Sequence, residues 1–115
     1  MDPSDLYAQT LSVLTSARST MLSPAWQAAM GNQTQAMRVA AAHQLGQLQS
    51  AINALGNKSL SDIATAMQAS AAGLTQSTQA LDDALRDITQ VQNIMASVTS
   101  ILNVVAEITD WAGPH

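Results

Sequence analysis

Apolar residues recur along the second half of this chain with the spacing of a helix face. From residue 60 onward, an apolar residue returns at every seventh position: Leu60, Met67, Leu74, Leu81, Ile88, Met95 and Leu102. A second set lies three residues further on: Ile63, Ser70, Ser77, Ala84, Val91, Val98 and Val105. Alternating steps of three and four place both sets on one helical stripe, and so many consecutive heptads favour coiled-coil packing. The pattern predicts a continuous helix over residues 60–111, about 75 Å long at about 1.5 Å per residue.

The apolar stripe widens toward the end of this predicted helix, where a third set of isoleucines joins it. A single facing helix would leave part of that surface bare, and soluble monomers rarely expose such a patch. Two tryptophans are further candidate anchors, since aromatic residues are enriched at binding hot spots. We therefore predict an interaction seam made of Leu74, Leu81, Ile88, Ile94, Met95, Ile101, Leu102, Ile108, Trp111 and Trp26.

The first half of the chain predicts two more helices, over residues 3–22 and 24–55. Pro3 fits the opening turn of the first one. Ser23-Pro24 separates the two helices, because serine is a good N-cap and proline suits the first helical position. Gly56 provides a stop signal, and Ser59 begins the helix over residues 60–111.

The turn that joins the two halves is only about four residues long, and a connection this short forces the flanking helices to be antiparallel. The fold class is therefore all-α: one domain over residues 1–115, built as a long antiparallel helical hairpin. The pattern leaves two arrangements open, in which the first helix either extends the second or folds back on it. Pairing of such hairpins would give a four-helix or larger bundle.

Charge is sparse and unevenly distributed. Residues 1–59 carry Arg18, Arg38 and Lys58 against two aspartates, whereas residues 60–115 carry six carboxylates against Arg86, and the net charge is −4. The basic residues are scattered singly, so the chain lacks the positive stripe that binds a phosphate backbone, and we expect no nucleic-acid partner. Cysteine is absent, which excludes disulfides and thiolate metal sites.

Few residues are candidates for chemistry. Asp83 and Asp87 share a helix face and could hold a hard cation, but beside Arg86 we interpret them as a solvated surface. His43 has no companion at metal-ligand spacing, and no nucleophile or phosphate-binding motif is found. The sequence therefore predicts neither an enzyme nor a bound metal or cofactor.

The size, the helical hairpin and the lack of cysteine are similar in outline to small secreted helical proteins of the W-x-G type. The motif is misplaced, however, because Trp111-Ala112-Gly113 lies at the end of the chain instead of the hairpin turn, which reads Gly56-Asn57-Lys58-Ser59. We do not assign the chain to that family.

These patterns indicate a bacterial, non-enzymatic interaction or assembly protein, such as a scaffold, adaptor, chaperone or secretion-associated subunit. Its partner would be a second copy or another helical protein, bound through the heptad seam of residues 60–111. The alternative is a protein that coats a membrane or an apolar inclusion through residues 94–111, although the lack of basic residues disfavours a membrane surface. The N-terminus lacks the basic-then-apolar layout of a signal peptide, so we expect a cytoplasmic protein, with leaderless secretion as the alternative.

Overall fold

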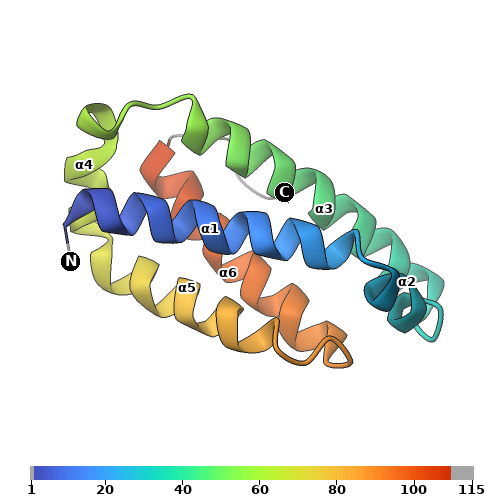
Figure 1. Ribbon diagram of the computed structural model, residues 1–115. Helices are drawn as coiled ribbons and strands as arrows, with labels where there is room; N and C mark the ends of the chain where they lie inside the picture. The colour runs from blue at the N-terminus through green and yellow to red at the C-terminus, as the bar shows by residue number, and fades with distance from the viewer. Residues whose placement is uncertain (1, 110–115) are drawn as a thin grey trace.

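The computed structural model describes residues 2–109 of the chain, and within that range every regular element is an α-helix (Figure 1). The helices are α1 (Pro3–Met21), α2 (Pro24–Met30), α3 (Gln35–Gly56), α4 (Leu60–Ala69), α5 (Ala71–Ala84) and α6 (Val91–Thr109). The all-α class predicted from the sequence is confirmed.

Four of these helices, α1, α3, α5 and α6, form a four-sided bundle. Helix α1 packs against α3 and α5, and α6 packs against the same two helices from the opposite corner. The chain runs in one direction along α1 and α5 and in the other along α3 and α6 (Figure 1). Two neighbouring pairs, α1 with α5 and α3 with α6, are therefore parallel. The short helices α2 and α4 lie at opposite ends of the bundle.

Side-chain caps explain where several of the helices begin. Asp2 accepts a hydrogen bond from the backbone N–H of Asp5, and Pro3 occupies the first turn of α1. Ser23, Thr34 and Ser59 each accept the backbone N–H three residues ahead, at the starts of α2, α3 and α4. These oxygens satisfy donors that would otherwise lack a partner at a helix start.

The predicted helix over residues 24–55 is broken into two. Helix α2 stops at Met30, and residues 31–34 form a turn before α3 begins. Gly31 ends the first piece, and the hydroxyl of Thr34, accepting from Met37 N at 3.1 Å, starts the second. The prediction of one helix was wrong because it did not recognise Thr34 as the N-cap of a new helix.

The predicted rod over residues 60–111 is also broken, and this changes the architecture. A kink at Ser70, with φ −104° and ψ 13°, separates α4 from α5. Residues 85–90 then form a turn, after which α6 runs back along α5. The continuous rod is therefore wrong, because α6 folds back on α5. Of the two arrangements left open for the first helix, the structure has the one in which α1 folds back on α3, and one chain builds the four-helix arrangement by itself.

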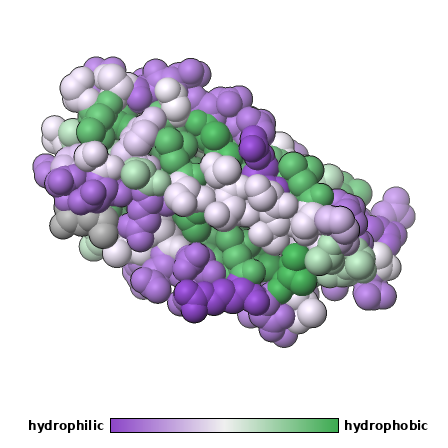
Figure 2. Space-filling model, in the orientation of Figure 1, coloured by the Kyte–Doolittle hydropathy of each residue, from purple (hydrophilic) through white to green (hydrophobic). Residues whose placement is uncertain are grey.

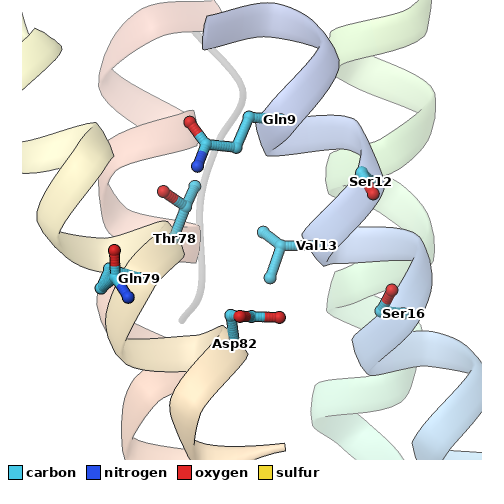
Figure 3. Close-up of a pocket in the computed structure, with 7 residues that line it drawn as sticks. All are labelled: Gln9, Ser12, Val13, Ser16, Thr78, Gln79 and Asp82. Atoms are coloured by element: carbon cyan, nitrogen blue, oxygen red, sulfur yellow. The ribbon is translucent and has the colours of Figure 1, made fainter.

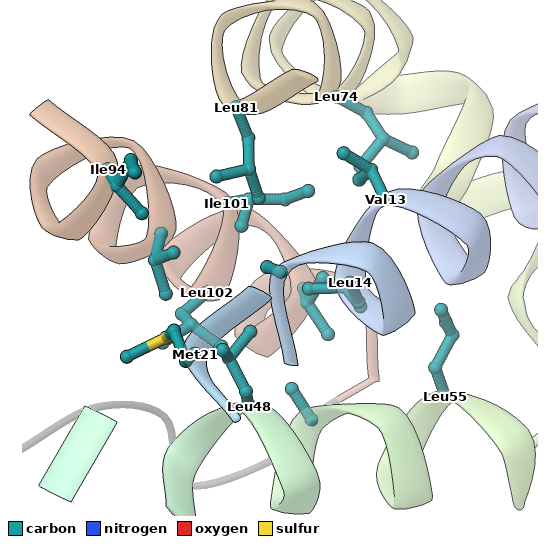
Figure 4. Packing of buried hydrophobic residues seen from close by; sticks show 14 of the residues in the cluster. Val13, Leu14, Met21, Leu48, Leu55, Leu74, Leu81, Ile94, Ile101 and Leu102 are labelled. Carbon is teal, nitrogen blue, oxygen red and sulfur yellow. The ribbon is translucent and has the colours of Figure 1, made fainter. Parts of the chain in front are cut away.

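The core lies between the four long helices and is made of one apolar stripe from each. Figure 4 shows these side chains converging: Val13, Leu14 and Met21 from α1, Leu48 and Leu55 from α3, Leu74 and Leu81 from α5, and Ile94, Ile101 and Leu102 from α6. Most of them are fully buried. Burial of a Leu or Ile side chain contributes about 1.5–3 kcal/mol, so this shared core is the main force that holds the helices together.

Candidate functional site

The residues predicted to form the interaction seam lie mostly inside the molecule. The fully buried members are Leu74, Leu81, Ile94, Ile101 and Leu102, and Ile108 is 7% exposed. Ile88 and Met95 are half-buried and pack against the same core. The heptad pattern is thus satisfied within one chain, because α5 and α6 turn their stripes toward each other and toward α1 and α3.

Of the two tryptophans predicted as anchors, the structure describes only Trp26. Trp26 on α2 is only 2% exposed, so its ring covers the end of the core instead of projecting toward a partner. Beside it, a small pocket of about 150 Å³ opens between α1, α2 and α3, with Met21, Met30 and Leu45 among its lining residues. Trp111 lies outside the described residues.

Charged groups are found at the surface, where they form a single described ion pair. Asp82 and Arg86, one helical turn apart, approach to 3.4 Å with both side chains well exposed. Such a pair contributes at most about 1 kcal/mol because water screens it. Within residues 2–109, no cluster of three or more His, Cys, Asp or Glu side chains could hold a metal ion.

One buried polar side chain links two helices across the core. Gln44 on α3, 6% exposed, donates its Nε2 hydrogens to the carbonyl oxygen of Met95 at 2.9 Å and to Oγ1 of Thr99 at 3.0 Å. Both acceptors belong to the first half of α6. These bonds fix the register of the parallel α3–α6 pair, because a shift of one residue would remove both acceptors.

A recess on the surface runs along the other parallel pair, α1 and α5. One hollow of about 220 Å³ is lined by Gln9, Ser12, Val13, Ser16, Thr78, Gln79 and Asp82. Figure 3 shows Gln9 and Val13 of α1 pointing toward Thr78 and Asp82 of α5. The lining is made mostly of hydroxyl and amide groups, with one carboxylate at the end.

A second hollow, of about 500 Å³, adjoins the first and shares Gln79 with it. Its other lining residues are Leu6, Ala71, Ala72, Thr75 and Gln76. We call the two hollows together the α1–α5 groove. Leu6, which is 1% exposed, lies at one end of it and Asp82 at the other, and Figure 2 shows hydrophobic surface in the gap between the two helices.

The sequence pattern did not indicate this groove. The heptads place Leu74 and Leu81 on the buried side of α5. The groove is lined by residues outside that stripe, among them Ala72 and Thr75 in one hollow and Ser12 and Ser16 in the other. The small size of those residues is the only local signal. The pairing of α1 with α5, which turns the signal into a groove, depends on the fold.

Helix α6 is, among the described residues, the one helix long and apolar enough to span a membrane. Core helices of compact proteins have the same composition, and Ile94, Val98, Ile101 and Leu102 all face the core of the bundle. Its length and apolarity are therefore accounted for by its place between α3 and α5.

Fold and surface together define a four-helix bundle with a shallow, elongated groove. Comparison of the chain with protein-family models, with curated proteins and with solved structures finds no match.

Proposed function

We propose that this chain is a non-enzymatic helical interaction protein, a scaffold, adaptor or assembly subunit, that receives a helix of another protein in the α1–α5 groove. The observation that carries the proposal is the groove itself, which is open, elongated and lined by alanine, serine, threonine and glutamine side chains. The heptad seam was the surface first expected to serve this purpose. Since that seam forms the core, the binding surface is assigned to the outside of the bundle.

The shape of the groove suits a helix. It extends between two parallel helices from Leu6 to Ser16 on α1, roughly 15 Å at about 1.5 Å per residue, which is close to three helical turns. Amphipathic helices bind such grooves by inserting side chains spaced three and four residues apart. Hydroxyl and amide groups along the lining can pair with polar groups at the edge of the inserted face.

The charge of the groove specifies the partner further. Asp82 lines the acidic end, and Asp83 is its exposed neighbour. Along α1, no charged residue occurs between Asp5 and Arg18. A helix with an apolar face and lysines or arginines at the end near Asp82 would complement this surface, and opposite charges across an interface increase both specificity and the rate of association.

Coating of a membrane or an inclusion through residues 94–111 is less well supported. Helix α6 has the required apolarity, but most of its large apolar residues are buried against α3, α4 and α5. This role would require α6 to leave the core.

The test is a titration monitored by ¹⁵N NMR, with amphipathic peptides of about 14 residues, which is about four turns. One peptide carries lysines at the end that would meet Asp82, and its counterpart carries glutamates. We expect shifts in α1 and α5 with the basic peptide, and a reversed preference in the Asp82→Lys/Asp83→Lys variant.

Two bulky substitutions locate the site. Gln79→Trp should fill the groove and abolish the shifts, whereas Ser50→Trp, on the exposed surface of α3, should leave them unchanged. Shifts spread over the whole bundle, or an equal loss in both variants, would refute the groove as the binding site.

A further inference from the structure

The turn between α5 and α6 has the sequence of a helix. Residues 85–90 read Leu-Arg-Asp-Ile-Thr-Gln and contain neither glycine nor proline. The heptad spacing also passes through the turn without interruption, from Leu81 through Ile88 to Met95. The sequence of this segment is therefore also compatible with one continuous helix over residues 71–109, about 58 Å long.

The bonds that hold the turn are few and local. Arg86 N and Asp87 N each donate to a carbonyl oxygen three residues back, at 3.3 Å, and Gln90 N donates to Asp87 O at 3.1 Å. The Asp87 carboxylate accepts from the backbone N–H of Thr89 at 3.2 Å and from its hydroxyl at 2.5 Å. Straightening the segment would exchange these bonds for ordinary helical ones, at little cost in hydrogen bonds.

A single molecule gains nothing by straightening, because α6 would expose its core side. Ile94, Val98, Ile101, Leu102 and Val105 are each at most 1% exposed in the bundle. A second copy removes this penalty: it offers an identical site between its own α3, α4 and α5, from which its own α6 has also departed. Every core contact of α6 then forms again, between chains, and only the turn differs between the two states.

We propose that residues 85–90 are a hinge on which α6 exchanges between two copies of this chain, giving a domain-swapped dimer. In this dimer α5 and α6 form one straight helix, and each α6 packs against the α3, α4 and α5 of the partner. Such exchange is an accessible route to dimers when a hinge tolerates two conformations. The proposal does not depend on the proposed function, since the α1–α5 groove lies on the other side of α5.

Two sets of substitutions bias the hinge in opposite directions. Asp87→Ala/Thr89→Ala removes the side-chain bonds of the turn and introduces strong helix formers, so it should raise the dimer association constant at least about tenfold. The hydrogen bond from Gln90 N to Asp87 O closes a four-residue turn, in which Ile88 is the second residue. Proline is favoured at that position, so Ile88→Pro should stabilise the turn. Because proline disrupts a continuous helix, this variant should lower the same constant about a hundredfold. Asp83→Ala, an exposed change inside α5, is the matched control and should leave it unchanged.

The association constants come from sedimentation equilibrium over micromolar to millimolar concentrations, after refolding at each concentration. A second measurement identifies the kind of dimer. Spin labels on Gln76→Cys and Ser100→Cys, both exposed positions in a chain without other cysteines, report the distance within one chain when it is diluted with unlabelled protein. In the monomer α5 and α6 are packed neighbours whose axes lie about 8–10 Å apart, so the distance between the labels should be clearly shorter than in the dimer. The dimer should give about 36 Å, the length of 24 residues of straight helix.

Two results would overturn the proposal. One is an Asp87→Ala/Thr89→Ala protein whose association constant does not exceed that of the Asp83→Ala control. The other is a dimer in which the 76–100 distance stays near that of the monomer, since such a dimer would have formed without opening the hinge.

Discussion

Leu81 and Leu22 are the same residue type in opposite environments. Leu81 of α5 is completely buried in the core, whereas Leu22, just after α1, is 59% exposed. From the heptad pattern, Leu81 was expected to face a partner, so that a charge at this position would dissociate an oligomer. Its burial within one chain means that Leu81→Asp should instead unfold the protein, because an unpaired carboxylate would enter the core.

The contrast gives a measurable prediction. Leu81→Ala should lower the free energy of unfolding by about 2–5 kcal/mol, because it removes buried methyl groups and leaves a cavity. Leu22→Ala should change it by no more than about 0.5 kcal/mol, as expected for a surface position. Urea denaturation followed by circular dichroism measures both. Similar losses in the two variants would show that Leu81 is not a core residue.

Gln44 affects the stability of the fold in two opposite ways. Its amide N–H groups bond to α6, but its Oε1 is buried and accepts no hydrogen bond from the described residues. Two hydrogen bonds of about 1 kcal/mol each are then offset by an unsatisfied carbonyl that costs about 1–3 kcal/mol.

Gln44→Met, which keeps the volume of the side chain, should therefore leave the unfolding free energy within about 1 kcal/mol of the original value. Gln44→Ala should lose about 1–3 kcal/mol more, because it also leaves a cavity. Equilibrium denaturation distinguishes the two. A loss above about 2 kcal/mol in Gln44→Met would mean that the bonds to α6 outweigh the buried carbonyl.

At the scale of single elements, the sequence predicts helices well where their ends carry side-chain signals. The end of α1, the start of α2 at Ser23 and the start of α4 at Ser59 all follow from caps that can be recognised in the printed sequence. The breaks at Ser70 and at residues 85–90 carry no comparable signal, since the apolar spacing runs through both. There the fold, by bringing α6 against α5, overrides a local preference for a longer helix.

Gly46 in α3 provides a test at this scale. A methyl group built on it would meet no atom within 4 Å, so this glycine serves neither a close approach nor a bend. Gly46→Ala should raise the unfolding free energy by about 0.5–1 kcal/mol, because alanine loses less backbone entropy in a helix.

Gly31→Ala is the useful comparison for Gly46→Ala. Its methyl group would lie 3.3 Å from the carbonyl oxygen of Ala28, a tight contact at the end of α2. This variant should gain less than Gly46→Ala or lose stability. Thermal unfolding of both proteins, side by side, tests the order.

At the scale of the whole molecule, the folded-back chain and the extended hairpin differ in length. The bundle measures 43 × 25 × 18 Å with a radius of gyration of 13.9 Å, whereas a continuous helix over residues 60–111 alone would reach about 75 Å. Small-angle X-ray scattering of a dilute sample should give a maximum dimension close to the shorter value. A maximum dimension near 75 Å would instead support the extended hairpin.

The class of the fold could be predicted from the sequence, but its topology could not. Apolar spacing identifies which side of each helix is buried, and that part was correct for Leu74, Leu81 and Ile101. It does not say which molecule supplies the covering surface, because a stripe on α6 fits α5 of the same chain as well as α5 of another. The candidate site was missed for the same reason: the α1–α5 groove exists only after two distant segments have been paired.

The turn after Gly56 divides the bundle into two helical hairpins. Helices α1 and α3 before it are antiparallel neighbours, and so are α5 and α6 after it, while the remaining contacts among these four long helices lie between the halves. Cutting the backbone at this turn would thus leave two hairpins, each with a bare apolar side that only the other can cover. Produced as separate peptides, they should remain unstructured apart and regain helicity on mixing, which would make this bundle a two-part complementation tag.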